Sequence, residues 1–285
     1  MQWTDAYVRA NGLRLCYRRA GSGSHLLLLH GVTGNGRGWG LTADRLMLDH
    51  DVILLDQRGH GHSDAPPRGY DLDSFAHDAA AVLAGLEAAP ATLLGHSLGA
   101  RVALRLAVLH PELVSCLILE DPPLDAQTAL TGTTSVDAAT ARYAWFAWLH
   151  ELRTLSRDAL VALRRRESPS WTADECVWWA QSIADAAAVL WSPDGLSIEG
   201  DWRRELATVR CPTLLIRGES AHGSLIGDEE AHDAGQSIAT GQVVQVLGAG
   251  HTIHWDRRAR FSDVVASFLA ASESEGTTKR GEGNV

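Results

Sequence analysis

A G-x-S-x-G pattern occupies residues 95–99, as Gly95-His96-Ser97-Leu98-Gly99. An apolar run over 91–94 precedes it, and a segment with helical character over 100–110 follows it. This order predicts a sharp strand-to-helix turn, at which small residues are needed because the backbones crowd together. The turn would expose the Ser97 hydroxyl at a helix N-terminus, where unpaired backbone N–H groups can receive a developing negative charge. The alternative interpretation is a serine that caps an ordinary helix.

The segments around this turn alternate between strand-like and helix-like patterns. Two strand-like runs flank Asn11-Gly12, which predicts an antiparallel hairpin at the start of the chain. Apolar runs of the kind found in strands buried on both faces follow at 25–30, 52–55, 91–94, 115–120, 212–218 and 243–247. Helices are expected over 39–48, 71–87, 100–110, 229–238 and 261–270. The sequence therefore predicts an α/β fold with a parallel sheet.

The region between 122 and 210 breaks this alternation, since it contains helical segments and no convincing strand. It also holds most of the 10 tryptophans of the chain. These tryptophans either form a small core of their own or line an apolar substrate pocket. The pocket candidates are Trp39, Trp145, Trp148, Trp178 and Trp179. We therefore expect a core over 1–121 and 211–271, a helical Trp-rich cap over 122–210, and a disordered polar tail over 272–285.

The composition limits the classes of partner. The formal net charge of −10 over 285 residues argues against nucleic acid, and Arg164-Arg165-Arg166 is interpreted as the solvated face of a helix. No membrane span or signal peptide is apparent, so we expect a cytoplasmic protein with a small-molecule substrate. The scattered cysteines imply neither disulfides nor zinc, and His60 and His62 lack a third ligand nearby. No metal and no cofactor are expected, and the oligomeric state stays open.

The chain resembles the α/β-hydrolase superfamily in four motifs, which follow the family's order between about residues 13 and 270. The motifs are His30-Gly31 with its glycine-rich loop, the run D-Q-R-G-H-G-H-S-D from Asp56, the turn at 95–99, and G-A-G-H ending at His251. The resemblance implies a mostly parallel eight-stranded sheet with helices on both faces. It also implies a helical cap inserted after the sixth strand, where the Trp-rich region lies.

A serine hydroxyl needs a base within hydrogen-bond reach to become a nucleophile, and the base is most often histidine. His251 is the best candidate, because it follows a strand and a Gly-Ala-Gly turn that can bring its ring over the edge of the sheet. His96 would point the wrong way from a sharp turn, and His254 is a minor rival. The backbone N–H groups of Val32 and Leu98 are the expected oxyanion donors.

The acid that would orient His251 departs from the common pattern. The family usually places it after the seventh strand in a G-x-x-D arrangement, but here Gly218 is followed by Glu219-Ser220-Ala221. Some relatives supply the acid from the end of the sixth strand, about two dozen residues past the nucleophile, which is the place of Asp121. We therefore predict Asp121 as the acid, with Glu219 as the alternative.

These residues favour a cofactor-free serine hydrolase that cleaves an ester, thioester or lactone of an apolar or aromatic substrate through an acyl-enzyme. One alternative is hydrolysis of a carbon–carbon bond in a diketone, and another is a ligand-binding protein with little turnover. Dehalogenase and epoxide hydrolase activities are disfavoured, because both would require an aspartate nucleophile at the position of Ser97. Fold alone does not set the reaction.

Overall fold

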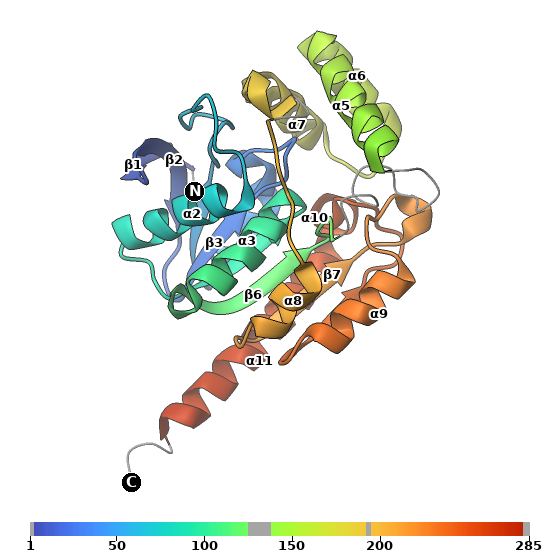
Figure 1. The fold of residues 1–285 in the computed structure, drawn as a ribbon. Coiled ribbons are helices and arrows are strands. Elements are labelled where there is room, and N and C mark those ends of the chain that lie inside the picture. The colour runs from blue at the N-terminus through green and yellow to red at the C-terminus, as the bar shows by residue number, and fades with distance from the viewer. Residues whose placement is uncertain (1–2, 125–137, 192–194, 282–285) are drawn as a thin grey trace.

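The computed structural model describes residues 3–124, 138–191 and 195–281 of the chain (Figure 1). Within these residues, eight strands form one sheet in the order β1-β2-β4-β3-β5-β6-β7-β8. The strands are β1 (Ala6–Ala10), β2 (Leu13–Ala20), β3 (His25–Leu29), β4 (Asp51–Leu55), β5 (Ala91–His96), β6 (Val114–Glu120), β7 (Thr213–Arg217) and β8 (Gly241–Gln245). Only the β1–β2 and β2–β4 pairs are antiparallel. The predicted α/β fold with a mostly parallel sheet is therefore confirmed.

Helices cover both faces of this sheet and occupy the long connection between β6 and β7. The α-helices are α1 (Gly40–Leu46), α2 (Leu72–Gly85), α3 (Leu98–Leu109), α5 (Ala138–Thr154), α6 (Arg157–Glu167), α7 (Ala173–Asp185), α8 (Trp202–Thr208), α9 (Asp228–Ser237), α10 (Ile253–Asp256) and α11 (Arg258–Gly281). Short 3-10 helices are η1 (Gly36–Trp39), η2 (Pro111–Leu113), η3 (Ala188–Trp191) and η4 (Ser220–His222). No helix in the described ranges is long and apolar enough to cross a membrane.

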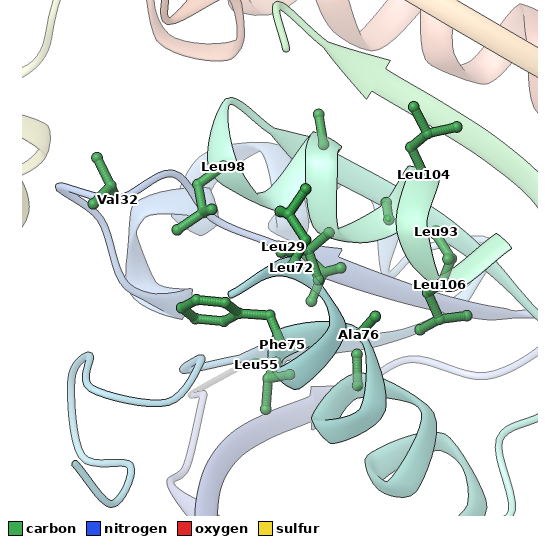
Figure 2. Close-up of a cluster of buried hydrophobic side chains, with 14 of the residues drawn as sticks. Leu29, Val32, Leu55, Leu72, Phe75, Ala76, Leu93, Leu98, Leu104 and Leu106 are labelled. Carbon is green, nitrogen blue, oxygen red and sulfur yellow. The ribbon is translucent and has the colours of Figure 1, made fainter. Parts of the chain in front are cut away.

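The apolar runs become central strands because both of their faces are buried. Along β3, Leu27 and Leu29 point to one core, and Leu26 and Leu28 point to the other. Alternate side chains of a strand face opposite sides, so a strand between two helical layers is apolar throughout. Figure 2 shows part of the first core, where side chains of the sheet meet Phe75 of α2 and helix α3.

The opening hairpin turns at the predicted dipeptide. Asn11 and Gly12 have φ values of 48° and 79°, which a type I′ turn requires at both central positions. At the other edge, β8 starts two residues before the predicted strand, because Gly241 pairs with Thr213 of β7. A side chain at Gly241 would lie 1.8 Å from the Thr213 carbonyl oxygen, so this register requires glycine.

The long connection after β6 contains a helical insertion made of α5, α6 and α7, which lie together at the top of Figure 1. Helix α8 does not join them, although the predicted cap extends to residue 210. It packs beside α3 and α9 along the sheet, where Trp202 and Leu206 are buried. Helix α8 therefore belongs to the layer beside α3 and α9 and not to the group of α5, α6 and α7.

The C-terminal segment also differs from the expectation. Residues 272–281 continue α11 as a helix, whereas the sequence pattern predicts a disordered tail. The segment contains no proline, and its first residues touch the body of the protein, since Ser24 Oγ donates to Glu273 Oε1 at 2.9 Å. Residues 282–285 lie outside the described ranges.

Candidate active site

Ser97 lies on the turn between β5 and α3 in a conformation that glycines on both sides make possible. Its φ and ψ are 53° and −118°, outside the regions that a serine usually adopts. A Cβ on Gly95 would lie 2.3 Å from the Gly99 oxygen, and one on Gly99 would lie 2.1 Å from the Leu29 oxygen. The predicted sharp strand-to-helix turn is therefore present, with Leu98 as the first residue of the helix.

Asp121 directly follows β6 and His251 lies in the loop after β8, and the two side chains form a direct hydrogen bond. His251 Nδ1 lies 2.7 Å from Asp121 Oδ2. A carboxylate can only accept, so this bond places the imidazole proton on Nδ1 and leaves Nε2 with its lone pair. Asp121 is fully buried, whereas the His251 side chain is 31% exposed. The arrangement gives an oriented base that faces accessible space.

Two further donors hold the Asp121 carboxylate, and the sequence interpretation missed both. Ser224 Oγ donates to Oδ1 at 2.6 Å, and the Leu225 N–H donates to Oδ2 at 2.8 Å. Both donors belong to the loop after β7, where the family's usual acid would lie. This loop therefore contributes two hydrogen bonds to the Asp121 carboxylate, which itself comes from the end of β6.

Glu219 does not contact His251. Its carboxylate accepts the N–H of Gly248 at 2.5 Å and lies 3.6 Å from His222 Nε2. Gly248 begins the turn that leads to His251, so Glu219 braces the backbone of this loop. The geometry brings Asp121, and not Glu219, to the imidazole.

His96 lies beside His251 as a neighbour of its backbone and ring. Its Nε2 donates to the His251 carbonyl at 3.0 Å, and the two ring centroids are 4.6 Å apart. Burial lowers the pKa of His96 to about 3, so the ring is neutral near pH 7. His96 thus links the Ser97 turn to the His251 loop.

His254 is held by a buried carboxylate. Its Nδ1 lies 2.7 Å from Glu120 Oε2, and its ring stacks on Trp39 with centroids 4.3 Å apart. Burial raises the pKa of Glu120 to about 7 and lowers that of His254 to about 3. Glu120 directly precedes Asp121 in the chain, and the His254 ring packs against His96 with centroids 5.2 Å apart.

The loop after β3 approaches Ser97 closely. A Cβ on Gly31 would lie 3.0 Å from His96 Nδ1 and 3.1 Å from Ser97 Cβ, so a side chain at this position would require these neighbours to shift. The Gly31 carbonyl accepts from the Gly34 N–H at 2.9 Å and from His30 Nδ1 at 2.8 Å. Because a trans peptide holds its N–H opposite its carbonyl, these bonds fix the direction of the Val32 N–H.

A pocket of about 220 Å³ opens beside His251, between this loop and the helical insertion. Trp39, Trp148 and Trp179 are among its lining residues, as is His251. Its size lies below the ~300–1,000 Å³ of pockets for drug-sized ligands, which suits a small substrate.

The remaining tryptophans divide between packing and further lining. Trp178 packs over Gly40 and is not among the lining residues. The side chain of Trp145 lies outside the described residues. Trp171 and Trp255 also line the pocket, and neither is among the predicted pocket candidates. Trp171 lies within the Trp-rich region, whereas Trp255 lies outside it. Its position four residues after His251 is a signal that could have drawn attention to it.

Arg164 also lines the pocket, contrary to its interpretation as part of a solvated helix face. Its neighbours Arg165 and Arg166 are exposed, as expected. Arg164 follows the buried Leu160 by four residues, which places both on the same face of α6. The four-residue spacing from Leu160 is therefore the feature of the sequence from which the burial of Arg164 could have been predicted.

Asp5, Cys16 and His62 offer three ligand atoms within 4.8 Å of one another. Asp5 already pairs with Arg18 Nε at 2.6 Å and with His62 Nδ1 at 2.7 Å. Burial raises the pKa of Cys16 to about 12, which favours the protonated thiol over the thiolate that binds metals. The group therefore fits a hydrogen-bonded cluster better than a metal centre.

The fold and this arrangement of side chains define a class of protein. A family model described as the alpha/beta hydrolase fold matches residues 24–258. The chain belongs to this family.

Individual relatives differ in the reactions for which they are named. The chain is 30% identical to N-formylmaleamate deformylase of Pseudomonas putida, over 92% of this chain and 95% of that protein. It is 29% identical to 2-hydroxymuconate semialdehyde hydrolase of Pseudomonas sp. strain CF600, over 94% of both chains. The crystal structure of E-2-(acetamidomethylene)succinate hydrolase superposes with a TM-score of 0.79 at 26% identity, over 94% of this chain and 100% of that one.

Proposed function

We propose that this protein is a serine hydrolase that cleaves an ester or amide bond of a small substrate through an acyl-enzyme. The observation that carries the proposal is the 2.7 Å hydrogen bond between His251 Nδ1 and Asp121, which leaves Nε2 available as a base. The strained position of Ser97 on its turn supports a nucleophile at this place.

In this mechanism the Ser97 hydroxyl attacks the substrate carbonyl while His251 Nε2 takes its proton. The backbone N–H groups of Val32 and Leu98 stabilise the oxyanion of the tetrahedral intermediate. His251 then gives the proton to the leaving oxygen or nitrogen, and the acyl group stays on Ser97. A water molecule, deprotonated by the same histidine, releases the acid and restores the serine.

The relatives extend the range of bonds beyond the ester, thioester or lactone favoured by the sequence. One relative is named a deformylase of N-formylmaleamate, so we include the amide bond. The second candidate is hydrolysis of a carbon–carbon bond, which the 2-hydroxymuconate semialdehyde hydrolase relative favours. Both reactions would use the same nucleophile.

Two measurements test the proposal. Mass spectrometry after treatment with a fluorophosphonate should find the label on Ser97, and Ser97→Ala should remain unlabelled. The wild-type enzyme should hydrolyse p-nitrophenyl esters or small N-formyl amides. Absence of labelling would refute the serine mechanism. Labelling with turnover of a dienoic diketone, and with neither esters nor amides cleaved, would favour the second candidate.

A further inference from the structure

Arg164 of α6 is a charged residue that the proposed mechanism does not use. Its guanidinium lies over the Trp179 ring, 3.9 Å from the centroid, and 4.9 Å from the centroid of Trp171. The side chain is only 15% exposed. Two aromatic side chains thus hold the guanidinium in a fixed place at the wall of the pocket.

The hydrogen-bonding capacity of this guanidinium is almost unused. Its Nε is buried and has no hydrogen-bond partner, although a guanidinium carries five N–H donors. One terminal nitrogen lies 3.5 Å from Ser168 Oγ and 3.9 Å from Glu167 Oε2, which are the outer limits of a hydrogen bond and an ion pair. A buried donor without a partner is costly, so an acceptor from a ligand would be strongly favoured here.

Three of the four histidines that line the pocket are uncharged near pH 7. Burial lowers the pKa of His30, His96 and His254 to about 3, so these rings are neutral near pH 7. The acidic lining residue, Glu167, is nearly half exposed and lies at the rim. Among the described residues that line the pocket, Arg164 is therefore the one with a permanent positive charge. The protein as a whole has a net charge of −10.

From this geometry we infer that Arg164 binds a carboxylate of the substrate, so that the enzyme acts on esters or amides that carry an anionic group. A planar carboxylate can accept two parallel N–H bonds from the edge of the guanidinium while the tryptophans cover its faces. The inference rests on the proposed function, because it names the substrate class for the same pocket. It makes Arg164 a determinant of specificity that takes no part in proton transfer.

Two pairs of matched esters test this role, and they place the carboxylate on different sides of the scissile bond. p-Acetoxybenzoate and the neutral p-acetoxybenzamide carry the difference in the leaving group. The p-nitrophenyl half-ester of glutarate and the neutral p-nitrophenyl isoheptanoate carry it in the acyl group. Rates are corrected for uncatalysed hydrolysis.

The wild-type enzyme should prefer the anionic member of at least one pair. Arg164→Met should lower the ratio of kcat/KM for that ester to kcat/KM for its neutral partner at least tenfold, about 1.4 kcal/mol. Arg165→Met, the matched control on the exposed side of α6, should leave kcat/KM for both esters unchanged. Arg164→Lys should give a smaller loss, and it serves as the test if the methionine variant does not fold. An unchanged anionic-to-neutral ratio in both pairs would overturn the inference.

Binding separates this inference from the proposed reaction. Calorimetry with Ser97→Ala protein should show that p-hydroxybenzoate binds more tightly than p-hydroxybenzamide, and that adding Arg164→Met removes the difference. If no ester or amide is turned over but this difference exists, the proposed function fails and the carboxylate site stands. Equal binding of the two compounds, together with no preference for the anionic ester of the acyl pair, would refute the site.

Discussion

Asp121 is the residue that orients the base of the proposed mechanism, His251. Asparagine has nearly the same shape but would favour the wrong tautomer of His251 and would not stabilise the imidazolium. Asp121→Asn should therefore lower kcat by about a thousandfold to ten-thousandfold in folded protein. Glu219→Gln is the control and should retain activity within a few-fold. The reverse result, measured with the same ester, would assign the acid to Glu219.

Glu120 and His254 form a buried pair whose pKa values move in opposite directions. The pKa of Glu120 rises from 4.5 to about 7, and that of His254 falls from 6.5 to about 3, both because of burial. Between pH 4.5 and 6.5 the folded protein keeps a proton on Glu120 that the unfolded chain has lost. It lacks a proton on His254 that the unfolded chain holds. The two effects on the pH dependence of stability therefore offset each other.

Single substitutions should reveal each half of this balance. The His254→Asn variant leaves only the effect of Glu120 on stability. The stability that the protonated Glu120 contributes is fully present below pH 4.5 and is lost as the pH rises toward 7, by up to about 1.4 kcal/mol per pH unit relative to wild type. In Glu120→Gln, stability is retained above pH 6.5 and lost as the pH falls toward 3. Urea unfolding at several pH values measures both slopes. Parallel curves for the variants and the wild type would contradict the assignment.

Some of these site residues could be predicted from the sequence and others could not, for physical reasons. Ser97 and His251 follow strands in recognisable turns, and the place of Asp121 follows from its distance along the chain to Ser97. Ser224 could not be found in this way, because a serine in a loop carries no pattern that points to a carboxylate across the sheet. Arg164 was open to prediction through Leu160, but helical periodicity says only which face is buried, not that a pocket lies there.

The turn that carries Ser97 depends on close backbone contact between β5, α3 and β3. A methyl group on Gly99 would collide with the Leu29 carbonyl oxygen. Only a movement of the backbone can relieve this collision, because the oxygen belongs to the main chain. Gly99→Ala should lower the free energy of unfolding by at least about 2 kcal/mol. Chemical denaturation followed by circular dichroism measures this change.

Gly235 of α9 provides the matched control for that substitution. A Cβ there would meet the Val243 side chain at 3.7 Å, an ordinary contact, and the residue is helical. Gly235→Ala should therefore raise stability by about 0.5–1 kcal/mol, because alanine favours the helix. Equal destabilisation by both substitutions would show that the close approach at Gly99 is not the cause.

Elements with both faces buried are the ones that periodicity predicts well. The β3 run His25–Leu29 has clear limits because apolar residues fill both cores. The ends of β8 and α11 were less well predicted, because these elements lie at an edge or extend past the core, where pairing and capping decide the length.

Two polar contacts from α7 help to join the helical insertion to the rest of the molecule. Buried Glu175 accepts from Arg258 of α11, and Ser182 Oγ donates to the Thr33 carbonyl at 2.6 Å. Removing one partner of a buried ion pair leaves an uncompensated charge. Arg258→Met should therefore lower stability by about 3 kcal/mol and raise KM more than it lowers kcat.

The exposed pair between Arg203 and Asp233 gives the comparison for this substitution. Both side chains are accessible, at 53% and 35% exposure, so solvent screens their attraction. Arg203→Met should change stability by less than about 1 kcal/mol and leave KM unaltered. Thermal unfolding and ester kinetics on the two variants check the contrast. Similar effects would mean that the α7 contact does not hold the insertion in place.

The position of Asp121 directly after β6 has a consequence for how the molecule assembles. Ser97 and Asp121 belong to one β5–α3–β6 crossover, where His96 pairs with Glu120 in register, so a local folding event brings them together. His251 lies 130 residues from Asp121 along the chain, and its contact forms only when both halves of the sheet have joined. Contacts of long sequence separation form slowly. Recovery of activity during refolding would therefore report the completion of the sheet, and not the earlier formation of the turn that holds the nucleophile.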